Sequence, residues 1–318
     1  MAAMRQIFEL VGTGIFAVDT LHVRARADAG YLLVEDGRAA FIDTGTHRSA
    51  PNFLETLAAL EIEPGCVEYI LLTHIHLDHA GGAGRLAAAL PRARVAVHPR
   101  GAAHLVDPSR LLTATKAVYG DDVFAAEFGD SLPIPSARIL ALEDGQRIRL
   151  GARTLEFIYT PGHALHHVCI VDRDRGEVFS GDTFGISYRE FDTVAGEFIF
   201  PTTSPAQFDP DQLHASVTRI AAIDPRVVYL THYGRVGHVD KLAADLHADI
   251  DALVGIARAA AAVPDRVTRM RAEIYRHWCG RLSAHGFCAE DGVRRGLLDN
   301  DAALNAAGLD AWLRRIAE

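Results

Sequence analysis

Cysteine, lysine and long apolar runs are all scarce in this sequence of 318 residues. Its four cysteines are too few and too scattered for a disulfide-stabilised scaffold, so we expect reduced thiols. No apolar run approaches the roughly 20 residues that span a bilayer, which argues against a membrane protein. The N-terminal stretch also lacks the apolar core and the small-residue cleavage site of a signal peptide, and we therefore expect a cytoplasmic protein.

Positive charge is outnumbered as well. The chain has 32 Lys and Arg against 41 Asp and Glu, a formal net charge of −9, and its only lysines are Lys116 and Lys241. Proteins bind nucleic acid largely through cationic side chains that face phosphates, and this chain has no basic run. We therefore expect a small-molecule substrate and no nucleic-acid partner, and we leave self-association into a homo-oligomer open.

Apolar runs with the spacing of strands alternate with runs of helical spacing over most of the chain. Strand candidates such as V-E-Y-I-L-L and V-V-Y-L are separated by segments whose apolar residues recur at helical spacing. This alternation predicts a layered α/β architecture. From Asp240 onward the apolar residues keep a helical period throughout. We therefore divide the chain into an α/β domain, residues 1–239, and a helical C-terminal extension, residues 240–318.

The stretch T-H-I-H-L-D-H-A-G-G, residues 73–82, concentrates metal-ligand side chains directly after a predicted strand. His74 and His76 can point to the same side, whereas Asp78 and His79 project from the turn that follows. Four such groups in six positions suit two adjacent ions better than one. Imidazole and carboxylate ligands favour Zn²⁺, with Fe or Mn as other occupants.

Three more ligand-type residues follow later predicted strands. They are His163 in T-P-G-H, Asp182 in S-G-D-T and His232 in L-T-H-Y. A sheet would bring these strand ends to one rim, where function-bearing loops of layered α/β folds usually lie. Together with residues 73–82 they complete two sets of metal ligands.

The order of these motifs resembles the metallo-β-lactamase fold superfamily, in its glyoxalase II-like branch, between about Tyr31 and His232. The resemblance implies a four-layer αβ/βα sandwich with a dinuclear site at one edge of the two sheets. It also implies that one metal is held by His74, His76 and His163. The other metal is held by Asp78, His79 and His232, and Asp182 bridges the two.

Asp43 matches the D-T-G motif of the same family, where the carboxylate usually stands behind a metal ligand. Such a carboxylate accepts the N–H of a metal-bound imidazole and fixes its tautomer. A water shared by two cations has its pKa lowered from 15.7 towards about 7, which gives a bridging hydroxide that can attack a carbonyl carbon. Asp78 and Asp182 are therefore our candidate catalytic residues, with Asp78 as a hypothetical proton relay.

Three further residues are weaker candidates for substrate contacts. Tyr188 and Arg189 lie in a segment after Asp182 with little regular pattern, which could be a lid or pocket wall. Tyr233 is adjacent to His232. A phenol could donate to an oxyanion and a guanidinium to an anionic substrate, but ordinary surface positions explain these residues equally simply. We also interpret His166 and His167 as surface or core histidines.

Several activities share this set of metal ligands. We expect a dinuclear metal-dependent hydrolase of a thioester, ester or lactone, glyoxalase II-like or lactonase-like. Glyoxalase II itself lacks support, because no Gly-Cys-Gly-Lys type of sequence follows Asp182, and Tyr188 is too far from Asp182 for the lactonase tyrosine. The alternative is a persulfide dioxygenase-like or other iron redox enzyme, and a lesser alternative is a phosphodiesterase or ribonuclease.

Overall fold

Two β-sheets form the centre of the computed structural model, which describes residues 7–203 and 207–318. The first sheet has seven strands in chain order, namely β1 (Phe8–Gly12), β2 (Ile15–Asp19), β3 (Ala29–Glu35), β4 (Arg38–Ile42), β5 (Val67–Leu71), β6 (Arg94–Val97) and β7 (Ile139–Ala141). The second has six, in the order β13 (Gly234–Val236), β12 (Val227–Leu230), β11 (Glu177–Gly181), β10 (Val168–Asp172), β9 (Arg153–Tyr159) and β8 (Arg147–Leu150).

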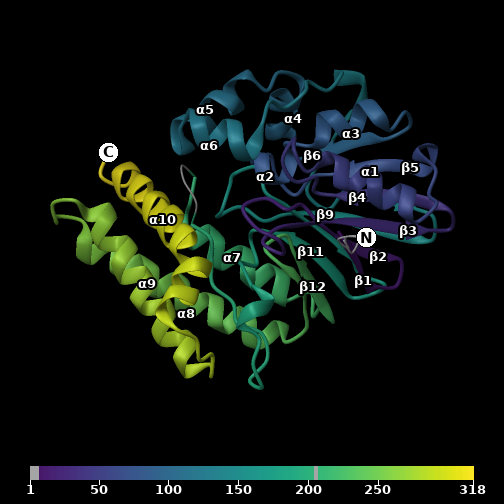
Figure 1. The fold of residues 1–318 in the computed structure, drawn as a ribbon. Coiled ribbons are helices and arrows are strands. Elements are labelled where there is room, and N and C mark those ends of the chain that lie inside the picture. The colour runs from purple at the N-terminus through teal and green to yellow at the C-terminus, as the bar shows by residue number, and fades with distance from the viewer. Residues whose placement is uncertain (1–6, 204–206) are drawn as a thin grey trace, which may run out of the picture.

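Helices cover the outer faces of both sheets (Figure 1). Those of the first half are α1 (Ala50–Ala59), α2 (Leu77–Ala80), α3 (Ala83–Ala89), α4 (Pro99–Val106), α5 (Ser109–Tyr119) and α6 (Asp121–Val123), followed by a π-helical turn at Phe124–Phe128. Those of the second half are α7 (Pro210–Ala221), α8 (Val239–Ala260), α9 (Arg266–Ala284) and α10 (Asp291–Arg315).

The alternation of side chains along each strand explains the layers. In β3, Tyr31 and Leu33 join the apolar cluster between the sheets, while Leu32 packs outward with α1 and α3. In β11, Phe179 points to the same central cluster and Val178 packs outward with α7 and α8. Successive residues of a strand face opposite sides, so each sheet contributes to two apolar layers. The four-layer sandwich expected from the sequence is confirmed.

The topology brings the functional strand ends to one rim. Strands β4 to β7 are parallel to one another, as are β11 and β12, and β9 runs in the same direction as β11 because both pair antiparallel with β10. The rims of the two sheets are joined directly. Val168 N–H donates to the Thr73 carbonyl over 2.8 Å, and Ala29 N–H donates to the Thr231 carbonyl over 2.8 Å.

The C-terminal helices pack against the sandwich and against one another. In Figure 1, α8, α9 and α10 lie together on one side of the sheets. Trp278 of α9 and Leu309 of α10 belong to the same apolar cluster as the residues between the sheets. The buried Asp249 of α8 accepts hydrogen bonds from Trp278 Nε1 over 2.9 Å and forms an ion pair with Arg281 over 2.8 Å. A domain boundary at 239/240 stays a prediction.

No helix within the described ranges has the length and apolar character needed to cross a bilayer. One region differs from the sequence pattern, which assigns no element between residues 107 and 150. The structure has α5, α6, β7 and β8 there, and α5 runs beside the predicted metal site. The segment after Asp182, for which the sequence suggested a lid or a pocket wall, packs inward with Phe191 and Phe200 fully buried, and its Ile186 lines the space beside the predicted metal site.

Candidate metal centre

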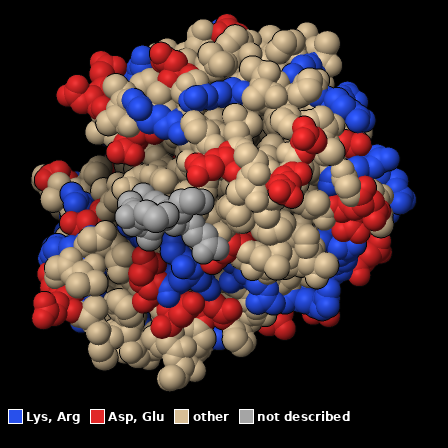
Figure 2. Space-filling view, turned by 45° about the vertical axis from the view of Figure 1, so that its right-hand side comes forward, with Lys and Arg blue, Asp and Glu red and all other residues tan. Residues whose placement is uncertain are grey.

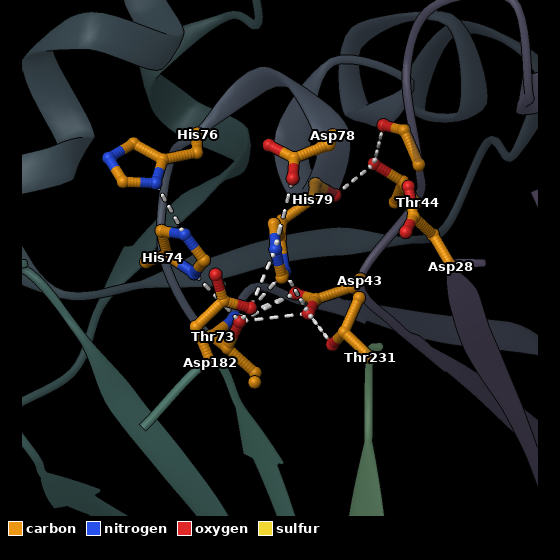
Figure 3. A network of polar contacts seen from close by, with 12 residues as sticks. Asp28, Asp43, Thr44, Thr73, His74, His76, Asp78, His79, Asp182 and Thr231 are labelled. Carbon is orange, nitrogen blue, oxygen red and sulfur yellow. Dashed lines mark hydrogen bonds and ion pairs between the residues drawn. The ribbon is translucent and has the colours of Figure 1, made fainter. Parts of the chain in front are cut away.

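The seven predicted ligands meet at the joined rims of the two sheets. Figure 3 shows His74, His76, Asp78, His79 and Asp182 among them. His74 and His76 lie on the loop after β5, and Asp78 and His79 lie on the single turn of α2. Asp182 follows β11, and His163 and His232 follow β9 and β12. Each side chain therefore occupies the end of a strand or the turn after it, where rigid hydrogen-bonded backbone fixes its position.

Three imidazoles form the first ligand group. His76 Nδ1 lies 2.9 Å from His74 Nε2 and 3.0 Å from His163 Nε2. Three nitrogens that bind Zn²⁺ at about 2.0–2.1 Å in a tetrahedral arrangement would be roughly 3.3 Å apart. The observed separations are slightly shorter, and a small outward movement would fit an ion.

The second ligand group consists of Asp78, His79 and His232. Asp78 Oδ2 lies 3.5 Å from His79 Nε2 and 3.7 Å from His232 Nε2. Asp182 stands between the two groups, with Oδ1 at 3.0 Å from His79 Nε2 and Oδ2 at 3.3 Å from His163 Nε2. Its two oxygens therefore face different groups, as a bridging ligand requires.

The buried polar atoms of this centre fit a cation. His79 Nε2 and Asp182 Oδ1 are both buried, and neither has a hydrogen-bond partner among the described residues. A buried polar atom without a partner is costly, and a divalent ion would satisfy both atoms at once. The donors are imidazole nitrogen and carboxylate oxygen, the set that suits Zn²⁺, Fe or Mn.

Burial and charge set the protonation of the two groups differently. Burial, aided by the neighbouring His163, lowers the pKa of His76 to about 3, and burial also lowers the pKa of His74 and His163. These rings are therefore neutral, as metal ligands must be. For His79, burial favours the neutral ring, but the surrounding carboxylates, Asp182 first, outweigh it and raise the pKa.

Carboxylates orient both imidazoles of the second group. Asp43 Oδ2 accepts from His79 Nδ1 over 2.8 Å, and Asp28 Oδ1 accepts from His232 Nδ1 over 2.6 Å. This arrangement keeps the proton on Nδ1 and leaves the Nε2 lone pair for a metal. Asp43 has a φ of +52°, a left-handed conformation that Asp tolerates, and it also accepts from Thr73 and Thr231. The sequence pointed to Asp43 but not to Asp28.

Both the sequence and the fold are similar to those of known proteins. The sequence model of the Metallo-beta-lactamase superfamily matches residues 29–232. The chain belongs to the metallo-β-lactamase superfamily. The structure of ST1585, an archaeal member of this superfamily from Sulfolobus tokodaii, is 21% identical and superposes with a TM-score of 0.65 over 94% of this chain and 98% of that one. The shared fold therefore extends into the C-terminal helices.

Two curated relatives in this superfamily have named activities. The hydroxyacylglutathione hydrolase of Aeromonas hydrophila is 29% identical over 203 residues, which are 64% of this chain and 59% of that protein. The human acyl-coenzyme A thioesterase MBLAC2 is 32% identical over 187 residues, 54% of this chain and 64% of that one. The match spans less than two thirds of either relative, and both relatives are hydrolases by name.

His167 fixes the position of the bridging Asp182. The Asp182 backbone N–H donates to His167 Nε2 over 3.1 Å, so Nδ1 carries the ring proton and lies 3.0 Å from the Thr183 hydroxyl. Gly181, with a φ of +49°, makes room for this contact, because a Cβ there would lie 2.6 Å from His167 Nε2. His167 is fully buried, so of the two alternatives from the sequence, surface or core, the structure shows the core position, and this position lies beside the metal centre.

The three weaker candidates lie apart from the ligands. The buried Tyr188 donates to Asp301 Oδ2 over 3.0 Å, and Arg189 donates to the Ser187 carbonyl over 2.8 Å. The Tyr233 hydroxyl lies 3.4 Å from Glu9 Oε1. The side chains of Arg189 and Tyr233 therefore contact groups outside the ligand set, and neither lines the cavity beside it. Tyr188 acts as a hydrogen-bond donor to Asp301.

A cavity of about 290 Å³ opens beside the metal centre. Asp78, Asp182 and His232 form part of its wall, and α5 and α10 supply half of the other lining residues. Tyr119 of α5 and Asp301 of α10 also line it. Burial, followed by Asp78, raises the pKa of Tyr119, and burial raises the pKa of Asp301 to about 7. Neither residue stood out in the sequence, because each lies on a helix outside the motifs.

Proposed function

We propose that this chain is a dinuclear metal-dependent hydrolase that cleaves acyl thioesters. The observation that carries the proposal is the pair of ligand groups joined by Asp182 and open to a cavity. The named hydrolase relatives support this class, and both act on thioesters if their names describe their substrates. Zn²⁺ is the proposed occupant of both sites, with Fe or Mn as alternatives.

His74, His76 and His163 would hold one ion, Asp78, His79 and His232 the other, and Asp182 both. Two divalent ions held here would supply Lewis acidity and lower the pKa of a shared water towards about 7. Asp28 and Asp43 keep the second-group imidazoles in the tautomer that presents Nε2. Asp78 faces the cavity and is the least buried of the three second-group ligands, which suits it to accept or return a proton.

The scarcity of basic side chains around the cavity supports a small-molecule substrate. Among the described residues that line the cavity, Arg110 is the one arginine and there is no lysine, and the carboxylates of Asp78 and Asp182 belong to the ligand groups and would be offset by bound ions. On the face shown in Figure 2, Lys and Arg side chains are interspersed with Asp and Glu. A polyphosphate backbone needs concentrated positive charge, so this distribution favours a small-molecule substrate over nucleic acid.

The test measures metals per chain and then hydrolysis by the metal-loaded protein. The substrates would be lactoylglutathione, acyl-coenzyme A thioesters, homoserine lactones and a phosphodiester, and Asp182→Ala would be assayed in parallel. We expect about two ions per chain and hydrolysis of thioesters that the variant loses. Absence of carbonyl hydrolysis by protein carrying both ions would overturn the proposal. Oxygen consumption with glutathione persulfide would favour the iron redox alternative instead.

A further inference from the structure

The wall of the cavity combines metal ligands with apolar side chains. Asp78, Asp182 and His232 are polar, whereas α5 contributes Leu111, Ala114 and Val118, and α10 contributes Leu304. These apolar side chains come from two helices that are far apart in the sequence but border the same space, to which the same helices also add polar side chains such as Arg110 and Asn305. Apolar side chains combined with a few polar groups are the usual form of a small-molecule site.

Helix α5 is the unusual part of this wall. None of its residues is fully buried, and Val118 is 47% exposed although it is apolar. Leu111, Leu112 and Tyr119 pack partly against a small cluster formed by Leu77 and the π-helical turn. Leu111 also packs against the larger apolar cluster outside the first sheet, so α5 is held by two apolar clusters while Val118 remains largely uncovered. A ligand in the cavity would cover that side chain.

Charge on the α10 side restricts the ligand further. The Asp301 carboxyl is buried, lines the cavity and is held by the Tyr188 hydroxyl at 3.0 Å. The guanidinium of Arg24 lies 4.3 Å from the centre of the Tyr188 ring, behind that contact. Burial raises the pKa of Asp301 to about 7, so at pH 8 this carboxyl is mostly ionised, and a carboxylate on the ligand would meet a like charge in a buried space. An uncharged chain meets no such cost.

We propose that the cavity between α5 and α10 binds an uncharged aliphatic acyl group, with the scissile carbonyl at the metal ligands. This inference rests on the proposed thioester hydrolysis and names its substrate class. Leu111, Ala114, Val118 and Leu304 contact the acyl chain, and Asp301 excludes acyl groups that end in a carboxylate. Burial of each methylene is expected to raise kcat/KM about fourfold, corresponding to ~0.8 kcal/mol, until the cavity is full.

The first experiment uses a series of S-acyl-N-acetylcysteamine thioesters, from acetyl to decanoyl, with metal-loaded protein. We expect kcat/KM to rise along the series and then level off. Ala114→Trp fills the cavity and should lower the octanoyl-to-acetyl ratio of kcat/KM at least tenfold. Ala117→Trp is the matched control, because Ala117 is also an exposed alanine of α5 but does not line the cavity. A flat series, or equal ratios in both variants, would overturn the acyl site.

The second experiment tests the charge. Hexanoyl and adipoyl thioesters differ by a terminal carboxylate, and at pH 8, where Asp301 is mostly ionised, we expect a preference for hexanoyl of at least tenfold. Asp301→Asn should reduce that preference severalfold by raising adipoyl turnover. An unchanged preference would remove Asp301 from the proposal.

Binding separates this inference from the proposed function. The S-octyl and S-methyl thioethers of N-acetylcysteamine have no carbonyl to cleave, and calorimetry on the metal-loaded protein measures their affinities. One outcome is that no thioester is hydrolysed, but the S-octyl thioether binds far better than the S-methyl thioether, and Ala114→Trp removes this difference while Ala117→Trp keeps it. The acyl site would then be supported and the proposed reaction would be wrong. If thioesters are hydrolysed without chain preference and the two thioethers bind equally, the reaction stands and the acyl site is wrong.

Discussion

The two ligand groups of the metal centre differ in what lies behind their imidazoles. In the first group, His74 Nδ1 faces the Thr73 hydroxyl at 3.2 Å and His163 Nδ1 faces the Thr202 carbonyl at 3.5 Å. In the second group, each imidazole donates to a buried carboxylate, at 2.8 Å for His79 and 2.6 Å for His232. Neutral oxygens thus support one group and anions the other.

This difference shows that the centre is electrically asymmetric. The first group offers three neutral nitrogens, and its negative charge comes only from the shared Asp182. The second group adds Asp78 as a ligand and Asp28 and Asp43 behind the imidazoles. A carboxylate that accepts the imidazole N–H makes the ring a stronger donor. Asp43 also reaches the first group, but only through the Thr73 hydroxyl that lies beside His74 Nδ1. We therefore expect Asp28 to affect the second group alone.

Removing the bridge should have the largest effect, because Asp182 is the one ligand common to both groups. We expect Asp182→Ala to lower kcat/KM by about a thousandfold or more and to reduce metal content well below two ions per chain. Elemental analysis and thioester assays would measure both. Asp174→Ala is the control, since Asp174 is exposed on the turn of the β10–β11 hairpin whose far end carries Asp182. Full metal content in Asp182→Ala would contradict the bridging role.

Loss of one outer carboxylate should lower the metal affinity of one ligand group more than that of the other. In Asp28→Asn, His232 loses its charged partner, and we expect the affinity for one ion to fall about 10- to 100-fold while the other ion is retained. Metal titration followed by calorimetry would resolve the two steps. Asp36→Asn, in the exposed β3–β4 turn, serves as the comparison. An equal weakening of both steps would mean that the asymmetry does not control metal affinity.

A change at His167, which accepts the backbone hydrogen bond of Asp182, should have a smaller effect. His167→Leu leaves the Asp182 N–H without its acceptor, which costs about 1–3 kcal/mol and should weaken metal binding roughly tenfold. His167→Gln keeps an acceptor and should restore most of that loss. Both ions should weaken together, because Asp182 serves both groups. Equal behaviour of the two variants would show that His167 acts through packing and not through its hydrogen bond.

The sequence identified the sandwich and the side chains that meet at its rim, because each follows an apolar strand within a distinctive motif. It did not indicate Asp28, which precedes β3 in an irregular loop, and its contact with His232 joins residues 204 positions apart. Such a contact depends on the packing of two sheets and leaves no local pattern. His167 was visible in P-G-H-A-L-H-H, but only the close approach at Gly181 reveals its contact with Asp182.

The cavity walls were harder to predict than the ligands. In helix α5, Leu111, Ala114 and Val118 recur at helical spacing, but none of the residues of this helix is fully buried. The spacing could have predicted the helix, but it could not show that a cavity, and not the apolar core, borders its apolar side. Asp301 and Leu304 lie on α10, within the helical extension expected over residues 240–318, but the sequence did not indicate that this helix would border the cavity.

The smallest predicted effect concerns Asp301, which lies on the second group's side of the cavity. Burial raises its pKa from 3.8 to about 7, with His232 acting in the opposite direction. The folded chain therefore keeps a proton that the unfolded chain has released, so stability falls as pH rises from about 4 to 7. Between pH 6 and pH 7 the loss should be about 1 kcal/mol in metal-free protein. Asp301→Asn should lack this component in urea denaturation at the two pH values. If the free energy of unfolding changed equally with pH in both proteins, Asp301 would be ionised at both pH values. Burial would then not hold a proton on the carboxyl near His232.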